Sequence, residues 1–413
     1  MRQALVAVAL LAACRGGHPS VRDAGRPRPA SAVSAPPSLV PKIGQSPDPI
    51  EAMRELDQRI AIHRKPGDEG QEIGFLLDRA AIRGDLEDYA EALALSGAWI
   101  EHAPKSDAAW KARVGVLTRV HRFGAARDAL DHLEPLVPDR SEWEGLAATI
   151  DEATGQLDRS APYREATARR WPSTVNLVQW ANSLALQGKL DDALAVMPKA
   201  AAVMRENPPE LFEYLYFQWG RLYEQKGEPA AARQFYEAAL ARLPTVEVQA
   251  HLAQALIATG DRDAARKVVT AALAGNRHPD LVALAAELEP DPGKRAALVA
   301  EAKAGWERYL AALPDAFADH AARFFVGVGG DPARALALAD QNLANRDTLE
   351  ARALVVEAAL AAGAPDRACA VAGPIAEPRA LRAQRFLAWR ALTACHRTDQ
   401  AARLGAELGI APP

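Results

Sequence analysis

Histidines, cysteines and glycine-rich turns are the parts of this chain that could do chemistry, and their spacing forms no catalytic or metal-binding pattern. None of the nine histidines stands in a His-x₃-His or His-Glu-x₂-His arrangement, the spacings by which one helix offers two ligands to zinc. No Gly-x-Ser-x-Gly turn presents a nucleophile. The glycine-rich stretch 326–331 lacks the Lys-Ser/Thr pair of a phosphate loop; Asp331 before Pro332 predicts a helix start instead. We therefore predict no catalytic residue, no metal site, no cofactor and no enzymatic activity.

The first fourteen residues, MRQALVAVALLAAC, have the character of an export signal. Arg2 gives a positive start, and residues 4–13 form an apolar stretch too short to span a bilayer, which needs about 20 residues. The sequence Leu11-Ala12-Ala13-Cys14 resembles the lipobox of bacterial lipoproteins. That resemblance implies removal of residues 1–13 and acylation of Cys14. Because Arg15 replaces the aspartate that retains many lipoproteins in the inner membrane, the resemblance favours the outer membrane, facing the periplasm. An ordinary signal peptide or a chance apolar start is the alternative.

Residues 14–47 are predicted to form the lipid anchor and a disordered tether. The segment is rich in proline, alanine, serine and arginine and carries few large apolar residues. A chain of this composition cannot bury enough apolar surface to fold. Residues 48–66 follow as an N-terminal helix, with Asp48 as its cap and Pro49 at its first position.

A proline recurs at intervals of 34 to 36 residues through most of the remaining sequence. The series is Pro104, Pro138, Pro172, Pro208, Pro244, Pro279 and Pro314. A period in this range is typical of stacked helical hairpins, in which each repeat buries its apolar face against its neighbours.

The clearest repeat lies in the middle of the chain and matches a known consensus. Its key residues are Tyr216, Trp219, Gly220, Tyr223, Gly227, Ala232, Tyr236, Ala239 and Pro244. This pattern resembles the tetratricopeptide repeat. The resemblance implies an all-α, right-handed superhelical array of about ten antiparallel helical hairpins. We divide it into repeats over 67–289 and a second segment over 290–413, because Pro290-Asp291-Pro292-Gly293 interrupts the pattern.

In tetratricopeptide arrays the first helices of the hairpins line a concave groove that binds ligands. By resemblance, the groove of this chain includes Lys111, Arg119, Asn182, Tyr214, Phe217, Arg221 and Gln254. Tyr214, Phe217 and Arg221 would form a binding hot spot, because aromatic residues and arginine dominate interface energies. The alternative is that the two rings pack against the preceding repeat, which is longer than the average.

Cys369 and Cys395 form the second chemical candidate. By repeat register, Cys369 lies early in the second helix of one hairpin and Cys395 lies late in the first helix of the next. Adjacent antiparallel helices bring these ends together, and an exported chain meets an oxidising compartment. We predict a disulfide; the alternative is two small buried apolar residues.

The charge pattern and the repeats together predict a binding protein. The formal net charge is −4 and the repeats contain no basic block, which argues against nucleic acid as a partner. We expect an interaction scaffold or adaptor of the cell envelope, held at the membrane through Cys14 and binding a protein or peptide in the groove. The alternative is a module that binds cell-wall glycan or peptide, or regulates a hydrolytic system.

Overall fold

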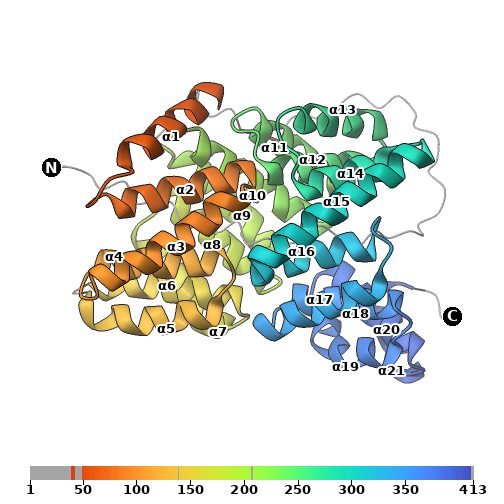
Figure 1. Cartoon of the computed structure of the whole chain (residues 1–413). Coiled ribbons are helices and arrows are strands. Elements are labelled where there is room, and N and C mark those ends of the chain that lie inside the picture. The colour runs from red at the N-terminus through yellow and green to blue at the C-terminus, as the bar shows by residue number, and fades with distance from the viewer. Residues whose placement is uncertain (1–38, 42–48, 138, 206–207, 411–413) are drawn as a thin grey trace.

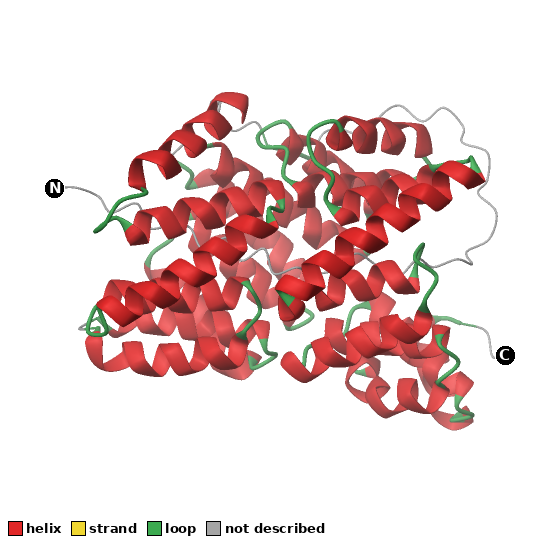
Figure 2. Ribbon diagram, in the orientation of Figure 1, coloured by secondary structure: helices red, strands yellow, loops and turns green. Residues whose placement is uncertain are grey.

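The fold consists of helices packed in sequence order. A computed structural model describes residues 39–41, 49–137, 139–205 and 208–410. Within these ranges it contains twenty-one α-helices, the short 3₁₀-helix η1 (Glu134–Leu136) and no strand (Figure 2). Helix α1 (Pro49–His63) precedes ten antiparallel pairs, which we number hairpins 1 to 10. The prediction of an all-α, right-handed superhelical array of about ten hairpins is confirmed.

The ten hairpins have the following bounds, given in chain order. They are α2 (Glu69–Arg83) with α3 (Leu86–His102), α4 (Asp107–Arg119) with α5 (Phe123–Leu133), α6 (Arg140–Ala153) with α7 (Leu157–Arg170), α8 (Thr174–Leu186) with α9 (Leu190–Ala202), α10 (Pro209–Lys226) with α11 (Pro229–Leu240), α12 (Val246–Ala258) with α13 (Arg262–Leu273), α14 (Pro279–Leu288) with α15 (Pro292–Ala312), α16 (Pro314–Val326) with α17 (Pro332–Asn345), α18 (Leu349–Ala361) with α19 (Pro365–Ala376), and α20 (Arg382–Ala394) with α21 (Thr398–Leu408).

Hairpin 5 shows how the consensus residues produce this shape. Gly227 ends α10 in the left-handed conformation, with φ of 81°, and Pro229 opens α11. A side chain at Gly220 would place its Cβ 2.6 Å from Cε1 of Tyr236. The absence of a Cβ therefore lets α11 pack closely against α10, as the repeat consensus predicts.

Short polar caps begin many of the helices. Ser106, Ser173, Thr245 and Thr348 each accept a hydrogen bond from a backbone amide in the first turn of α4, α8, α12 and α18. Asp331 accepts the N–H of Arg334 at 3.0 Å, as its position before Pro332 predicts. These caps satisfy amides that have no partner inside the helix.

The superhelix closes on itself after six hairpins. The turn of hairpin 1 meets hairpin 7 and the loop before it. A Cβ on Gly84 would lie 2.5 Å from Cδ2 of His278 in that loop, and the hydroxyl of Tyr309 in α15 donates to the Gly84 carbonyl at 2.8 Å. A Cβ on Gly155 in hairpin 3 would lie 2.3 Å from the carbonyl oxygen of Asp347, just before hairpin 9. A Cβ on Gly188 in hairpin 4 would lie 2.3 Å from that of Arg379, before hairpin 10.

We call this line of contacts the seam: the turns at residues 84, 121, 155 and 188 against the loops at residues 278, 345–348 and 379. Asn345 contributes to it by donating to the carbonyl of His121 at 2.7 Å. Helix α15 accordingly lies beside α3 (Figure 1). Hairpins 7 to 10 therefore lie against hairpins 1 to 4, and the concave face is enclosed between two successive turns.

The hydrophobic core continues across the seam. Leu86 and Val120, from hairpins 1 and 2, belong to the same buried cluster as Trp306 and Phe317 from hairpins 7 and 8. The predicted boundary near residue 290 falls in the loop between α14 and α15, inside hairpin 7. The division into two segments stays a prediction. No helix in the described part of the chain is both long and apolar enough to cross a bilayer.

The N-terminal region differs from the prediction in one respect. Cys14 and Asp48 lie outside the described residues, whereas residues 39–41, which belong to the predicted disordered tether, lie against hairpin 5. The N–H of Leu39 donates to Oε1 of Gln234 at 2.9 Å, and the Tyr216 hydroxyl donates to the carbonyl of Pro41 at 3.1 Å. Three residues of the tether thus have defined partners on the array.

Candidate binding site on the concave face

The enclosed concave face contains a cavity of about 250 Å³. Its walls come mainly from the first helices of the hairpins: α2, α4, α10, α12, α14, α16 and α18. Both superhelical turns contribute, because α2 and α4 come from the first turn and α14, α16 and α18 from the second. Apolar residues such as Phe317, Phe324 and Leu284 line part of the cavity. The acidic and basic lining residues are Arg119, Arg221, Glu247, His251, His278, Asp280, Glu287, His320, Arg323 and Glu357.

One polar network fixes the wall formed by α10 and α12. Nδ1 of His251 lies 3.0 Å from Oε2 of Glu224, and Nη1 of Arg221 lies 3.2 Å from Nε2 of His251. These contacts hold the imidazole between the carboxylate and the guanidinium. The Tyr236 hydroxyl also donates to Glu224, at 2.6 Å. Burial, helped by the Glu224 charge, raises the pKa of Tyr236 well above its usual value.

Glu247 is one of the acidic groups that line the cavity. Burial raises its pKa, although the charges of His251, His320, Arg221 and Arg119 act in the opposite direction. Four basic groups from α4, α10, α12 and α16 therefore face one carboxyl. Nη1 of Arg119 is buried and has no hydrogen-bond partner within the described structure. A buried guanidinium nitrogen without a partner costs free energy that a ligand oxygen would recover.

A second network fixes the opposite wall, at the seam. Nδ1 of His320 contacts Oδ2 of Asp280 at 2.9 Å, and His278 lies 3.8 Å from the same oxygen. Burial opposes ionisation of Asp280, but His320 outweighs it, so the pKa of Asp280 is lowered. Burial is also the main reason that the pKa of His278 falls to about 4. His278 is therefore neutral at neutral pH.

Behind this wall lies a buried ion pair. Nη2 of Arg346 contacts Oδ2 of Asp319 at 2.6 Å, with the two residues 7% and 1% exposed. Burial would raise the pKa of Asp319, but Arg346 and neighbouring histidines lower it to about 2. Burial and Arg346 together lower the pKa of the adjacent His121 to about 3.

The predicted groove residues divide into three sets. Arg119, Arg221 and Gln254 line the 250 Å³ cavity. Asn182, Tyr214, Phe217 and again Arg221 line a separate cavity of about 50 Å³. Lys111 lines neither cavity; it forms ion pairs with Asp107, at 3.0 Å, and with Glu142. The resemblance thus placed three of seven residues at the larger cavity.

The aromatic pair of the predicted hot spot is part of the core. Tyr214 is 3% exposed and Phe217 is 4% exposed. The Phe217 ring packs edge-on against His251, with centroids 5.2 Å apart. The two rings are therefore buried, and an exposed aromatic hot spot at these residues is corrected accordingly. The ring contacts of Phe217 are to Tyr236 in its own hairpin and His251 in the following hairpin, and not to the preceding repeat as the alternative expected. A ligand could meet the two rings only through the small cavity that they line.

The sequence reasoning missed the acids and histidines of the larger cavity. The histidines showed no pattern in the sequence, yet His251, His278 and His320 meet there. A signal was present: Glu213, Glu247 and Asp280 are 34 and 33 residues apart, so acids recur near the start of three successive first helices at about the repeat period. Glu213 is buried beside this site, and burial together with the Glu247 charge raises its pKa to about 8, against the hydrogen bond from Thr245.

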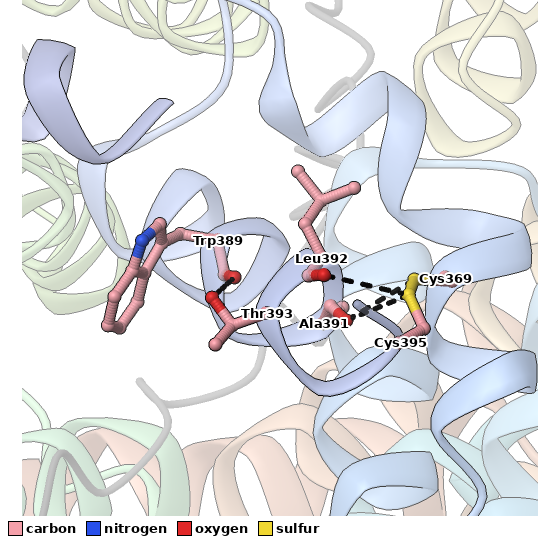
Figure 3. The surroundings of a disulfide bond; sticks show 6 residues. All are labelled: Cys369, Trp389, Ala391, Leu392, Thr393 and Cys395. Carbon is pink, nitrogen blue, oxygen red and sulfur yellow. Dashed lines mark hydrogen bonds between the residues drawn. A yellow bond between two sulfur atoms is a disulfide. The ribbon is translucent and has the colours of Figure 1, made fainter. Parts of the chain in front are cut away.

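The structure joins Cys369 of α19 and Cys395, which caps α20, as a disulfide (Figure 3). Their Cα atoms are 6.6 Å apart, and both sulfurs lie beside the carbonyl of Ala391. The two cysteines occupy the helix positions that the repeat register predicted.

The lining of the cavity determines the chemistry that it offers to a ligand. Among the described residues, no group of three or more histidine, cysteine or acidic side chains is placed to hold a metal ion. The residues that line the 250 Å³ cavity include no serine, threonine, cysteine or lysine, the side chains that most often serve as nucleophiles. What the cavity offers is a set of hydrogen-bond donors and charges of both signs.

No protein-family model matches the chain, and no curated protein matches it in sequence. Solved structures are similar in part. Human IFIT1, as a dimer with m7Gppp-AAAA, is 16% identical over 86% of this chain and 78% of its own, with a TM-score of 0.47. Cut9 from the APC/C hetero-tetramer Cut9–Hcn1 is 15% identical over 74% of this chain and 59% of its own, with a TM-score of 0.44. TTC0263, a tetratricopeptide protein of Thermus thermophilus, is 20% identical over 51% of this chain and all of its own, with a TM-score of 0.36.

Proposed function

We propose that this chain is a lipid-anchored interaction scaffold of the cell envelope, which binds a protein through a charged segment that enters the cavity around Glu247. The observation that carries this proposal is the cavity itself: charges of both signs converge there from first helices of two superhelical turns. Arg119 adds a buried donor without a partner, which suits a carboxylate or carbonyl oxygen of the ligand.

The N-terminal sequence supports the location. Leu11-Ala12-Ala13-Cys14 ends a short apolar segment, and the resemblance to a lipobox supports acylation of Cys14. Acyl chains on one cysteine would hold the array at a membrane surface, because each buried CH₂ contributes about 0.8 kcal/mol. Arg15 favours the outer membrane of a two-membrane envelope. Labelling cells with an alkyne fatty acid should mark the chain, and Cys14→Ala should remove the label.

Partner capture tests the cavity directly. A photoreactive residue at Gln254 faces the cavity, and one at the exposed Lys267 on α13 serves as the control. We expect one protein to crosslink in envelope membranes from Gln254 and not from Lys267. Arg119→Gln should weaken that capture at least fivefold, while Arg403→Gln, on the exposed face of α21, should leave it unchanged. Equal crosslinking from both positions would show that the cavity is not the binding surface.

A second candidate ligand follows from the size of the cavity. Pockets for drug-sized molecules usually measure about 300–1,000 Å³, and this cavity of about 250 Å³ is slightly smaller. A short cell-wall peptide carries both an ammonium and a carboxylate, which matches the mixed charges of the lining. Isothermal titration with purified muropeptides separates the two candidates. A heat of binding that is seen with the wild-type chain and lost in Arg119→Gln, together with no protein crosslink from Gln254, would favour the small ligand.

A further inference from the structure

The contact between residues 39–41 and hairpin 5 has the features of a built site. Two backbone groups of the segment are engaged, the N–H of Leu39 by Gln234 and the carbonyl of Pro41 by the Tyr216 hydroxyl. Between them, the partly buried Val40 packs against the buried core of hairpins 3 to 7. A short segment whose backbone groups are paired and whose side chain packs on an apolar surface is a common form of peptide recognition.

Neither neighbouring hairpin has the pair of residues that makes these bonds. In the repeat register, Tyr216 corresponds to Leu177 in hairpin 4 and to Gln249 in hairpin 6, neither of which has a hydroxyl. Gln234 corresponds to Ala195 and Lys267, neither of which offers an amide oxygen. The neighbouring hairpins share the fold and lack the partners, so the segment is recognised by side chains specific to hairpin 5.

We propose that hairpin 5 carries a docking site for a short segment with a branched apolar residue before proline, and that residues 39–41 of the same chain occupy it. The N-terminal tether therefore leaves the array at its middle and not at α1. Proline at the third position fits, because the site uses its carbonyl and needs no N–H there. This inference is independent of the ligand proposed for the cavity.

Docking changes the geometry of the anchor proposed at Cys14. From Cys14 to Leu39 the chain advances 25 residues, and from Cys14 to Pro49 it advances 35. A partner that displaces the segment would lengthen the tether and move its point of attachment from hairpin 5 to α1.

Peptide binding to the full chain tests the site. A fluorescent peptide of residues 37–43 should bind the Val40→Asp chain at least tenfold more tightly than the wild-type chain, whose site is occupied by its own segment. Adding Tyr216→Phe to the Val40→Asp chain should weaken peptide binding about fivefold, whereas Tyr223→Phe on the same helix should not. Circular dichroism of each variant confirms that the helices are retained.

Two outcomes would overturn the proposal. Equal affinity of the peptide for the wild-type and Val40→Asp chains would show that residues 39–41 do not occupy the site, and no binding to either would show that no such site exists. A photoreactive residue at position 40 in the otherwise wild-type chain gives an independent measurement. Its intramolecular crosslinks should fall on α10 or α11, and crosslinks elsewhere would contradict the inference. None of these readouts requires Cys14 or a ligand in the cavity.

Discussion

Replacing Gly188 by alanine should loosen the seam, and Gly227→Ala provides a matched control. Both glycines end the first helix of a hairpin with φ of 81°. Alanine in this left-handed conformation costs about 1–2 kcal/mol, and this cost is the same at both positions. The Cβ at residue 188 would additionally lie 2.3 Å from the Arg379 carbonyl oxygen, whereas nothing lies within 4 Å of a Cβ at residue 227.

The second cost arises from the contact between superhelical turns. Because the atom opposite Gly188 is a backbone oxygen, the clash can be relieved only by moving the loop that precedes hairpin 10. Overpacking of this kind typically costs about 1–3 kcal/mol. We expect Gly188→Ala to lower the free energy of unfolding by about 2–5 kcal/mol in total. Gly227→Ala should lower it only by the cost of alanine in the left-handed conformation, about 1–2 kcal/mol.

Urea titration monitored by circular dichroism gives the total loss, and hydrogen exchange locates it. In Gly188→Ala, amides of α20 and α21 should exchange faster, because hairpin 10 loses its support from hairpin 4. Gly227→Ala should leave those amides unchanged. Equal losses of stability in the two variants, with no local change in hairpin 10, would refute the idea that the seam holds the two turns together.

Three further predictions concern buried groups. Glu213 keeps its proton in the folded state up to a pH of about 8 and ionises near 4.5 when unfolded, so its contribution to stability falls as the pH rises between these values. Glu213→Gln should therefore gain stability relative to wild type by at most about 1.4 kcal/mol per pH unit in that range, measured by urea titration at several pH values. Cys369→Ser with Cys395→Ser should destabilise hairpins 9 and 10 by about 3 kcal/mol, because the bridge spans 26 residues. Hydrogen exchange measures this loss. A reductant should destabilise the wild-type chain and not the variant, and an equal effect on both would contradict the prediction. Asp319→Ala should cost about 3–5 kcal/mol by leaving the buried Arg346 unpaired, and Asp319→Leu with Arg346→Met should recover most of this loss.

The local structure of the array was predictable because short-range rules determine it. Gly227 and Pro229 mark the end of one helix and the start of the next, and Gly220 marks a close approach of two helices; each of these signals depends on residues within one repeat. The position of Asp331 as a cap follows from its immediate neighbour. A period of 34 to 36 residues then repeats these local signals along the chain.

The closure of the superhelix was not predictable, because it depends on small angles between successive hairpins that add up over six repeats. No single repeat encodes that Gly188 will meet Arg379, 191 residues away. The repeat consensus therefore predicts a concave groove but not its closure by a second superhelical turn. The meeting of His251 and His320 was unpredictable for the same reason, since closure is what brings them to one cavity.

Closure also couples ligand binding to the stability of the array. His278 belongs to the loop that meets Gly84 at the seam, and it lies 3.8 Å from Asp280 in the cavity wall. Opposite it, Arg119 comes from α4, in the other superhelical turn. A ligand that contacts Arg119 and the α14–α16 wall together would hold the two turns in register, while a ligand that contacts one turn alone would not. The first kind of ligand must therefore slow hydrogen exchange along the seam as well as in the cavity, by an amount set by its affinity.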